Sequence, residues 1–177
     1  VCLTEETVET LYLLGEQERI VGVSGYAVRP PQVRKEKPRV SAFISADIPK
    51  ILALEPDLVL AFSDLQGQLA ADLAKAGIAV HVFNQRDIAG IFGMIRTLGA
   101  LVDASAKAEA LANRLKQRLD TVAAAAARNG AQPKVYLEEW NDPLISGICW
   151  VSELIEVAGG VDAFPDLRRE QGAKQRI

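Results

Sequence analysis

Short apolar runs alternate with helical periodicity along the first hundred residues of the chain. The runs at 20–23, 58–62 and 78–83 lack the polar alternation of a half-exposed strand. Between the last two, Leu65 and Leu69 are spaced for one face of a helix. Continuous apolar strands separated by amphipathic helices are typical of a parallel sheet covered by helices on both faces. The pattern therefore predicts a Rossmann-like α/β lobe with strands at 1–3, 20–23, 58–62 and 78–83 and helices at 5–14, 47–54, 64–76 and from 87 onward.

A much longer helix is predicted after this lobe. The segment Ser105–Asn129 contains no Gly or Pro, and Leu111, Leu115, Leu119 and Val122 fall on one stripe. At about 1.5 Å per residue, such a helix is on the order of 36 Å long. This length exceeds what a crossover between neighbouring strands needs, so we expect a helix that connects two lobes.

The remainder of the chain predicts only part of a second α/β lobe. A strand is expected at 135–138, a loop at 139–148 and a helix at 150–157. We therefore divide the chain into an N-terminal lobe (1–103), a spanning helix (104–130) and a partial C-terminal lobe (131–177). One strand and one helix leave an apolar face and strand edges uncovered. We expect the parent protein to continue past this point, and self-association through the incomplete lobe is the alternative way to cover it.

Composition and charge narrow the function classes. The net charge is −3 and the pI is about 5.3, which argues against a nucleic-acid footprint. No apolar run is long enough to span a membrane. The chain begins within an apolar strand and without Met, so we expect that its natural start, with any targeting signal, lies upstream. Positive charge is nevertheless concentrated in one segment. The segment is either a solvated loop or a rim for an anionic ligand. Its basic residues are Arg29, Arg34, Lys35, Lys37 and Arg39.

The usual signatures of catalysis and of cofactor binding are missing from the sequence. There is no GxGxxG, no GxxxxGK[ST] and no GxSxG motif. His81 is the only histidine and lies inside a predicted strand, so a zinc site with several histidines is excluded. We expect no catalytic residues and no cofactor.

Aromatic and polar residues recur where the predicted strands end. Ligands of open α/β sheets bind at the carboxyl ends of the strands. Aromatic side chains with a few polar groups at such an edge suit a large flat or amphipathic ligand. The candidate contacts are Tyr26, Arg29, Phe43, Phe62, Asp64, Trp140 and Asp142.

Four segments, in order and with similar spacing, carry a resemblance to a known family. They read EETVETLYLLGEQERIVGVSGYAVRPP, KPRVSAFISADIPKILALEPDLVLAF, PKVYLEEWNDPLISG and ELIEVAGGVDAF. The chain resembles a periplasmic substrate-binding protein of an ABC importer, of the long-helix class that delivers cobalamin, haem or ferric siderophores. The resemblance implies two α/β lobes joined by one rigid helix, ligand held between them, an extracytoplasmic location and no catalysis.

The resemblance also assigns roles to individual positions. Tyr26, Phe43 and Phe62 match places where cobalamin-binding members present aromatic side chains, and Trp140 lies in the facing loop of the second lobe. Arg29 replaces an aromatic residue of those members, and its charge suits a carboxylate or an iron-chelating oxygen. A corrinoid is the leading ligand and a ferric siderophore the next.

Members of the family dock on the ABC permease through one acidic residue in each lobe. The usual glutamate of the first lobe falls at Pro49, so the nearby Asp47 is its expected substitute. In the second lobe Glu153 and Glu156 are candidates, with Asp162 a third.

Two other interpretations of the sequence stay open. One is an α/β enzyme or nucleotide-binding module that uses Glu139 and Asp142 as acid and base, although the sequence offers no phosphate loop or nucleophile for it. The other is an inactive fragment of the receptor.

Overall fold

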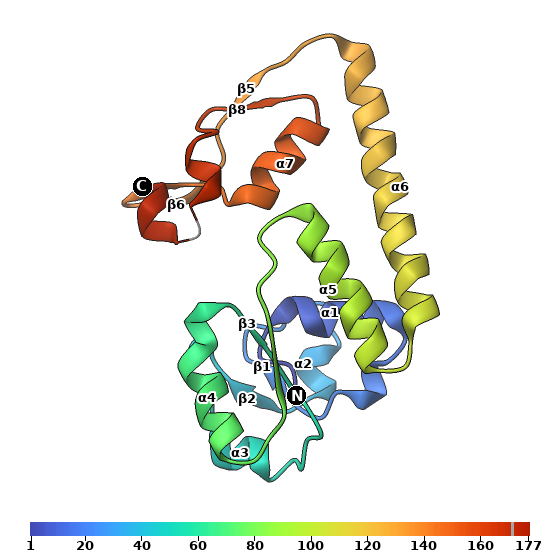
Figure 1. The fold of residues 1–177 in the computed structure, drawn as a ribbon, viewed down its shortest axis with the longest axis vertical. Coiled ribbons are helices and arrows are strands. Elements are labelled where there is room, and N and C mark those ends of the chain that lie inside the picture. The colour runs from blue at the N-terminus through green and yellow to red at the C-terminus, as the bar shows by residue number, and fades with distance from the viewer. Residues whose placement is uncertain (171) are drawn as a thin grey trace. The chain divides into compact units, whose positions relative to one another are not determined.

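The computed structural model describes residues 1–170 and 172–177, which divide into two compact units (Figure 1). The first unit consists of Val1–Asn84 and Met94–Leu111, and the second of Gln85–Gly93 and Ala112–Ile177.

Helices and short strands alternate along most of the chain. The α-helices are α1 (Glu5–Leu14), α2 (Val33–Glu36), α3 (Ile48–Leu52), α4 (Gly67–Lys75), α5 (Ile88–Leu101), α6 (Ser105–Asn129) and α7 (Cys149–Val157). The strands are β1 (Val23–Ser24), β2 (Arg39–Ser41), β3 (Val59–Phe62), β4 (Val80–Phe83), β5 (Lys134–Val135), β6 (Glu138–Asn141), β7 (Leu144–Ser146) and β8 (Val161–Asp162). Short 3₁₀ helices lie at Gln17–Arg19, Asp64–Gln66, Leu167–Arg169 and Ala173–Arg176.

The first unit is built on a parallel sheet, as the apolar runs predict. β1 pairs with β2 and β3 pairs with β4, both in parallel. Cys2 forms parallel bridges to Val23 on one side and to Leu60 on the other. The N-terminal segment Val1–Leu3 is therefore the middle of the sheet, between β1 and β3.

Both faces of this sheet are covered, which explains why β3 shows no polar alternation. Val59 and Ala61 lie in an apolar core with residues of α3 and α4. Because successive strand residues point to opposite faces, Leu60 points to the other side. There it lines a cavity together with Leu11 of α1 and Leu101 of α5.

The strand and helix boundaries in the first unit differ from the predicted ones. The predicted strand at 20–23 is shorter than expected and lies later in the sequence, at β1. The hydrogen bonds to the N-terminal segment are made there: Cys2 N donates to Gly22 O (3.0 Å), and Ser24 N donates to Cys2 O (2.9 Å). The basic segment that follows this strand, which the sequence predicts as a solvated loop or as a rim for an anionic ligand, contains the short helix α2. The predicted helix at 64–76 is divided into a 3₁₀ turn at Asp64–Gln66 and α4.

The second unit contains two small sheets and α7. β5 pairs with β8 in parallel, and β6 pairs with β7 as an antiparallel hairpin. The loop predicted at 139–148 is thus wrong in part: Trp140 pairs with Ile145, and the chain turns at Asp142-Pro143. Gly159 ends α7 with a φ of 82°, and a Cβ there would lie 2.9 Å from Ala126 Cβ, so glycine permits both the turn and the close approach to α6.

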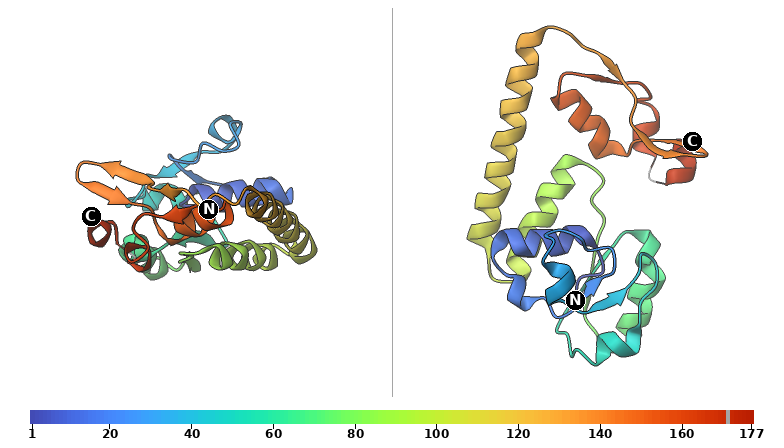
Figure 2. Two further views of the ribbon diagram at one scale, coloured as in Figure 1. Left: turned by 90° about the horizontal axis from the view of Figure 1, so that it is seen from above. Right: turned by 180° about the vertical axis from the view of Figure 1, so that it is seen from behind.

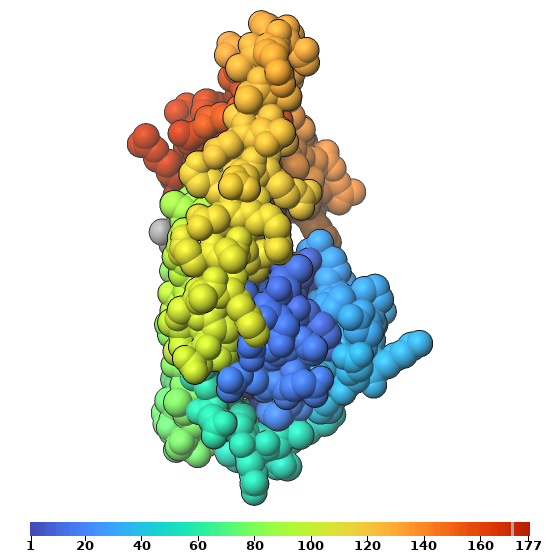
Figure 3. Space-filling view, turned by 90° about the vertical axis from the view of Figure 1, so that its right-hand side faces the viewer, coloured from blue at the N-terminus to red at the C-terminus, as the bar shows by residue number. Residues whose placement is uncertain are grey.

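α6 is one continuous helix, as predicted, but little of it is buried. Ala108, Leu111 and Ala112 are buried, whereas Val122 is exposed although it belongs to the predicted apolar stripe. Figure 3 shows α6 along the surface, with its first turns beside the beginning of the chain, where Lys107 Nζ lies 2.7 Å from Glu16 Oε1.

The end of α5 packs against the start of α6 unusually closely, and the rear view of Figure 2 shows the two helices side by side here. A Cβ placed on Gly99 would lie 2.2 Å from Ala108 Cβ and 3.2 Å from Ala104 O. No side chain larger than hydrogen fits at this crossing without moving one of the helices.

We predict that Gly99→Ala destabilises the protein by about 1–3 kcal/mol, because the overlap with Ala108 outweighs the helix propensity of alanine. Gly93→Ala in the same helix is the matched control, since nothing lies within 4 Å of its Cβ position. It should stabilise the protein by roughly 0.5–1 kcal/mol. Urea unfolding measures both, and equal gains from the two substitutions would contradict this packing.

Candidate ligand-binding site

The carboxyl end of β3 turns sharply after Phe62. Ser63 is fully buried and adopts φ 55° and ψ 175°, a conformation that residues with a side chain rarely take. Its N–H donates to Phe83 O at 2.7 Å, and its Oγ accepts from Leu65 N at 3.2 Å. Phe62 is half-buried at this turn, and Asp64 follows as an exposed residue.

Two exposed aromatic side chains from neighbouring loops meet at this edge. Tyr26 is 61% exposed and Phe43 is 52% exposed, with ring centroids 6.4 Å apart and planes at 81°. Tyr26 follows β1, where its N–H donates to Ser24 Oγ, and Phe43 lies in a tight turn closed by Ala42 N and Ser45 O. We call Tyr26, Phe43 and Phe62 the aromatic rim. Sequence reasoning predicted all three residues, and the structure places each of them just beyond or at the end of a strand.

Arg29 does not stand free beside the aromatic rim. Its Nε lies 3.3 Å from Glu5 Oε1 and its Nη2 lies 3.6 Å from Glu9 Oε2. Two carboxylates of α1 thus oppose its charge, although the side chain is largely exposed. The arginine is held by the first unit itself, which the sequence did not indicate.

In the second unit, Trp140 is 60% exposed on the hairpin. Its indole Nε1–H donates to the carbonyl oxygen of Asp142 at 3.0 Å, so the hairpin turn already satisfies the one donor of the ring. The Asp142 residue is exposed. Trp140 can therefore offer a flat apolar face but no further hydrogen bond.

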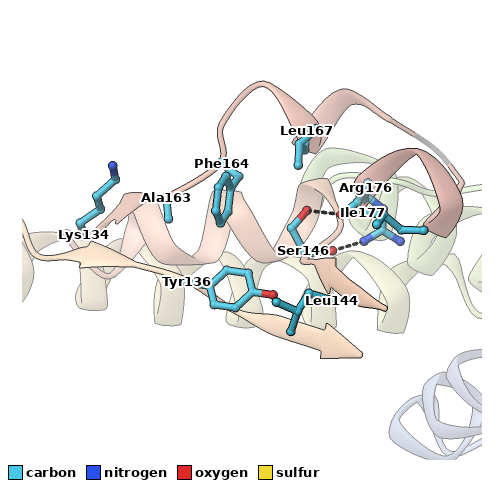
Figure 4. A pocket seen from close by; sticks show the side chains of 9 residues that line it. All are labelled: Lys134, Tyr136, Leu144, Ser146, Ala163, Phe164, Leu167, Arg176 and Ile177. Carbon is cyan, nitrogen blue, oxygen red and sulfur yellow. Dashed lines mark hydrogen bonds between the residues drawn. The ribbon is translucent and has the colours of Figure 1, made fainter. Parts of the chain in front are cut away.

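A second feature of this unit was not predicted from the sequence. A cavity of about 580 Å³ is lined by Lys134, Tyr136, Leu144, Ser146, Ala163, Phe164, Leu167, Arg176 and Ile177 (Figure 4). Tyr136 and Phe164 meet edge to face with centroids 5.5 Å apart. The buried Arg176 donates to Ser146 O and to Glu139, and it accepts from Ser146 Oγ through its carbonyl oxygen. Glu139, a candidate acid or base, is thereby engaged in an ion pair.

The candidate docking acids all have partners within their own unit. Asp47 Oδ1 accepts from Lys50 N at 3.0 Å and caps α3. Glu153 Oε2 accepts from Ile88 N at 2.7 Å at the start of α5. Glu156 pairs with Arg168 and remains about half exposed, with 51% of its side chain accessible.

Neither thiol has the properties of a nucleophile. Burial raises the pKa of both Cys2 and Cys149, and the Glu153 carboxylate raises the pKa of Cys149 further. Both are therefore protonated at neutral pH. Among the described residues, no group of three His, Cys, Asp or Glu is placed to hold a metal ion. No helix within the same residues is long and apolar enough to cross a bilayer.

Sequence reasoning missed Gln66, the residue that joins two parts of the aromatic rim. Its amide accepts from Phe62 N at 2.9 Å and donates to Phe43 O at 2.7 Å. An isolated glutamine between a strand and a helix gives no signal in the sequence: its bond to Phe62 N is local but follows no recognisable motif, and its bond to Phe43 O depends on the tertiary fold.

Comparison with known proteins identifies similar sequences and structures. A family model described as periplasmic binding protein matches residues 1–176. The chain is 30% identical over 172 residues to a vitamin B12-binding protein of Yersinia pestis (strain Pestoides F), covering 95% of this chain and 60% of that protein. The structure of the periplasmic vitamin B12-binding protein of Vibrio cholerae is 27% identical with a TM-score of 0.77, covering 93% of this chain and 65% of that one.

A further solved structure shares the fold at lower identity. A possible iron-binding, periplasmic solute-binding protein of Staphylococcus epidermidis ATCC 12228 has a TM-score of 0.83 at 22% identity, covering 95% of this chain and 67% of that one. The chain thus spans about 60% of the length of the curated relatives it matches.

We predict that Glu153→Ala lowers the free energy of unfolding by roughly 0.5–2 kcal/mol, because Ile88 N loses its capping partner. Glu156→Ala is the control: it removes a carboxylate whose ion pair is solvent-exposed, so it should cost less than about 1 kcal/mol. Thermal and urea unfolding would separate the two variants. If Glu153→Ala leaves stability unchanged, the residue has no capping role.

Proposed function

The chain belongs to the periplasmic binding protein family, and on that basis we propose that it is an extracytoplasmic receptor for an ABC import permease. Its relatives of this type are solute-binding proteins and not enzymes. The alternative of an α/β enzyme with Glu139 and Asp142 as acid and base is not favoured.

The aromatic rim is the observation that carries the proposal. Tyr26 exposes more than half of its surface to water and Phe43 about half, and Ile44 beside Phe43 is also exposed. Large apolar side chains gathered at one exposed edge mark a binding surface. Aromatic faces and edges suit a broad, flat ligand, which buries much area against few side chains. The rim is therefore proposed as the contact surface of the first unit for a large chelate, with Asp64 at its border.

A corrinoid is the proposed ligand, with a ferric siderophore as the next choice and haem as the third. The relatives of highest identity described above are vitamin B12-binding proteins, whereas the iron-binding relative shares the fold at lower identity. The pairing of Arg29 with two carboxylates supports this order, because a charge opposed by Glu5 and Glu9 attracts an anionic ligand less. Trp140 and Asp142 are the proposed contacts of the second unit.

Docking on the permease is proposed to use exposed acids on each unit. Asp47 is the proposed acid of the first unit. In the second unit Glu156 is favoured over Glu153, because Glu153 caps α5 whereas Glu156 is half exposed. A permease arginine would have to displace Arg168 from Glu156.

Self-association of the second unit is a separate proposal. Leu144, Phe164 and Val161 expose apolar surface near the two short sheets, and among the described residues each strand of these sheets pairs with one neighbour. Light scattering at several concentrations tests it, and a strictly monomeric protein would contradict it.

We predict saturable binding of cyanocobalamin in isothermal titration calorimetry. Tyr26→Ala and Phe43→Ala should each weaken it on the order of tenfold, as expected for the loss of an aromatic anchor. Leu13→Ala is the matched control, since Leu13 is an exposed apolar residue of α1 that is not part of the rim. It should leave the affinity unchanged.

Titrations with a ferric hydroxamate siderophore and with haemin decide between ligand classes. Tighter binding of either one than of cyanocobalamin would overturn the corrinoid assignment but keep the receptor function. Absence of binding for all three would overturn the proposed function.

A further inference from the structure

Gln66 is a fully enclosed polar side chain between β3 and α4. Only 2% of its surface is exposed, and its amide makes three hydrogen bonds: Oε1 accepts from Phe62 N at 2.9 Å, and Nε2 donates to Phe43 O at 2.7 Å and to Leu3 O at 3.3 Å. The opposite orientation of the amide would set an oxygen against two carbonyl oxygens. The three hydrogen bonds therefore determine which amide atom of Gln66 is Oε1 and which is Nε2.

The amide takes the place of a rung of the parallel ladder. Leu60 N donates to Val1 O at 2.8 Å, and Leu3 N donates to Leu60 O at 2.9 Å. Continued by one step, this pattern would have Phe62 N donate to Leu3 O. Instead the Gln66 amide bonds to both of these groups. Its second N–H is thereby left to hold the carbonyl oxygen of Phe43, in a loop that belongs to another strand.

The backbone around Gln66 needs such restraint. Ser63 carries the strained φ of 55°, and conformations of this kind cost roughly 1–3 kcal/mol and persist only where the surroundings determine them. Phe43 lies in a turn with exposed side chains, where little apolar packing restrains it. Gln66 thus bonds to two segments that would otherwise be able to move separately.

We propose that Gln66 is the positioning residue of the aromatic rim: it holds the backbones of Phe43 and Phe62 in one arrangement and does not touch the ligand. Phe43 in turn meets Tyr26 edge to face, so the position of all three rings depends on one buried amide. The consequence for binding rests on the proposed function, whereas the consequence for the backbone does not.

Two substitutions separate the hydrogen bond that Gln66 accepts from the two that it donates. Gln66→Met keeps the length of the side chain and removes all three hydrogen bonds. Gln66→Glu keeps an acceptor for Phe62 N and, as a carboxylate, has no proton to donate to Phe43 O or Leu3 O. Gln68→Met is the matched control, because Gln68 is exposed and, within the part of the chain that the structure describes, its side chain bonds to Asp72 of the same helix.

The first measurement is amide hydrogen exchange by NMR without ligand. In Gln66→Met the Phe62 amide should exchange roughly five- to tenfold faster, as expected for the loss of one hydrogen bond. The Ser63 amide, which bonds to Phe83 O, should keep its protection. In Gln66→Glu the Phe62 amide should stay protected. Equal acceleration of Phe62 and Ser63 in Gln66→Met would show general destabilisation and overturn the proposal. If Gln66→Met does not fold, the decision passes to Gln66→Glu, where acceleration of the Phe62 amide would overturn it.

The second measurement is the affinity for cyanocobalamin by calorimetry. Both variants should bind roughly tenfold more weakly, because ordering of the rim side chains then has to occur on binding. Gln68→Met should bind as the unsubstituted protein does. Unchanged affinity of Gln66→Glu would overturn the positioning role and leave the receptor function standing. If the unsubstituted protein binds none of the three ligands, the receptor function fails, and hydrogen exchange still decides the role of Gln66.

Discussion

The backbone of Val1–Leu3 forms hydrogen bonds to both of its neighbours, to Gly22 and Ser24 on one side and to Leu60 on the other. Through these bonds the pairs β1–β2 and β3–β4 become one sheet. The segment also ends early, since α1 begins at Glu5. The main-chain hydrogen bonds between this segment and β3 therefore end at Leu3, one step before Phe62. The proposed binding edge begins at this gap, where a side-chain amide replaces main-chain pairing.

Stability and binding place opposite demands on this edge. Exposed rings at Tyr26 and Phe43 forgo the burial that would stabilise a core, and Ser63 holds an unfavourable backbone conformation. The rest of the first unit compensates, because both faces of β3 are buried and α5 packs against α6 without space for a methyl group at Gly99. A rim of this kind needs little rearrangement to meet a rigid ligand, which reduces the entropic cost of binding.

The sequence was sufficient for the architecture and for the positions of the rim residues at strand ends, and insufficient for the contacts that support them; the binding role of the rim stays a prediction. Apolar runs without alternation predicted a sheet covered on both faces, and strand ends located Tyr26, Phe43 and Phe62, because both signals are local. Gln66 bonds to Phe43 and Leu3, which lie 23 and 63 residues away in the sequence. Glu153 bonds to Ile88, 65 residues away, so no local pattern indicates these contacts. The hairpin at Trp140 was missed because Asn-Asp-Pro is equally typical of a loop and of a turn between two paired strands.

Cys2 makes the opening of the central sheet chemically detectable. Its thiol lies in the middle of the sheet with 1% of its surface exposed, and burial raises its pKa. An alkylating reagent can reach it only in molecules whose sheet has opened, so the rate of labelling reports the free energy of that opening. Cys149 is partly exposed and provides an internal reference within the same molecule. The rate of Cys2 labelling, compared with that of Cys149, therefore reports the opening of the central strand without any introduced probe.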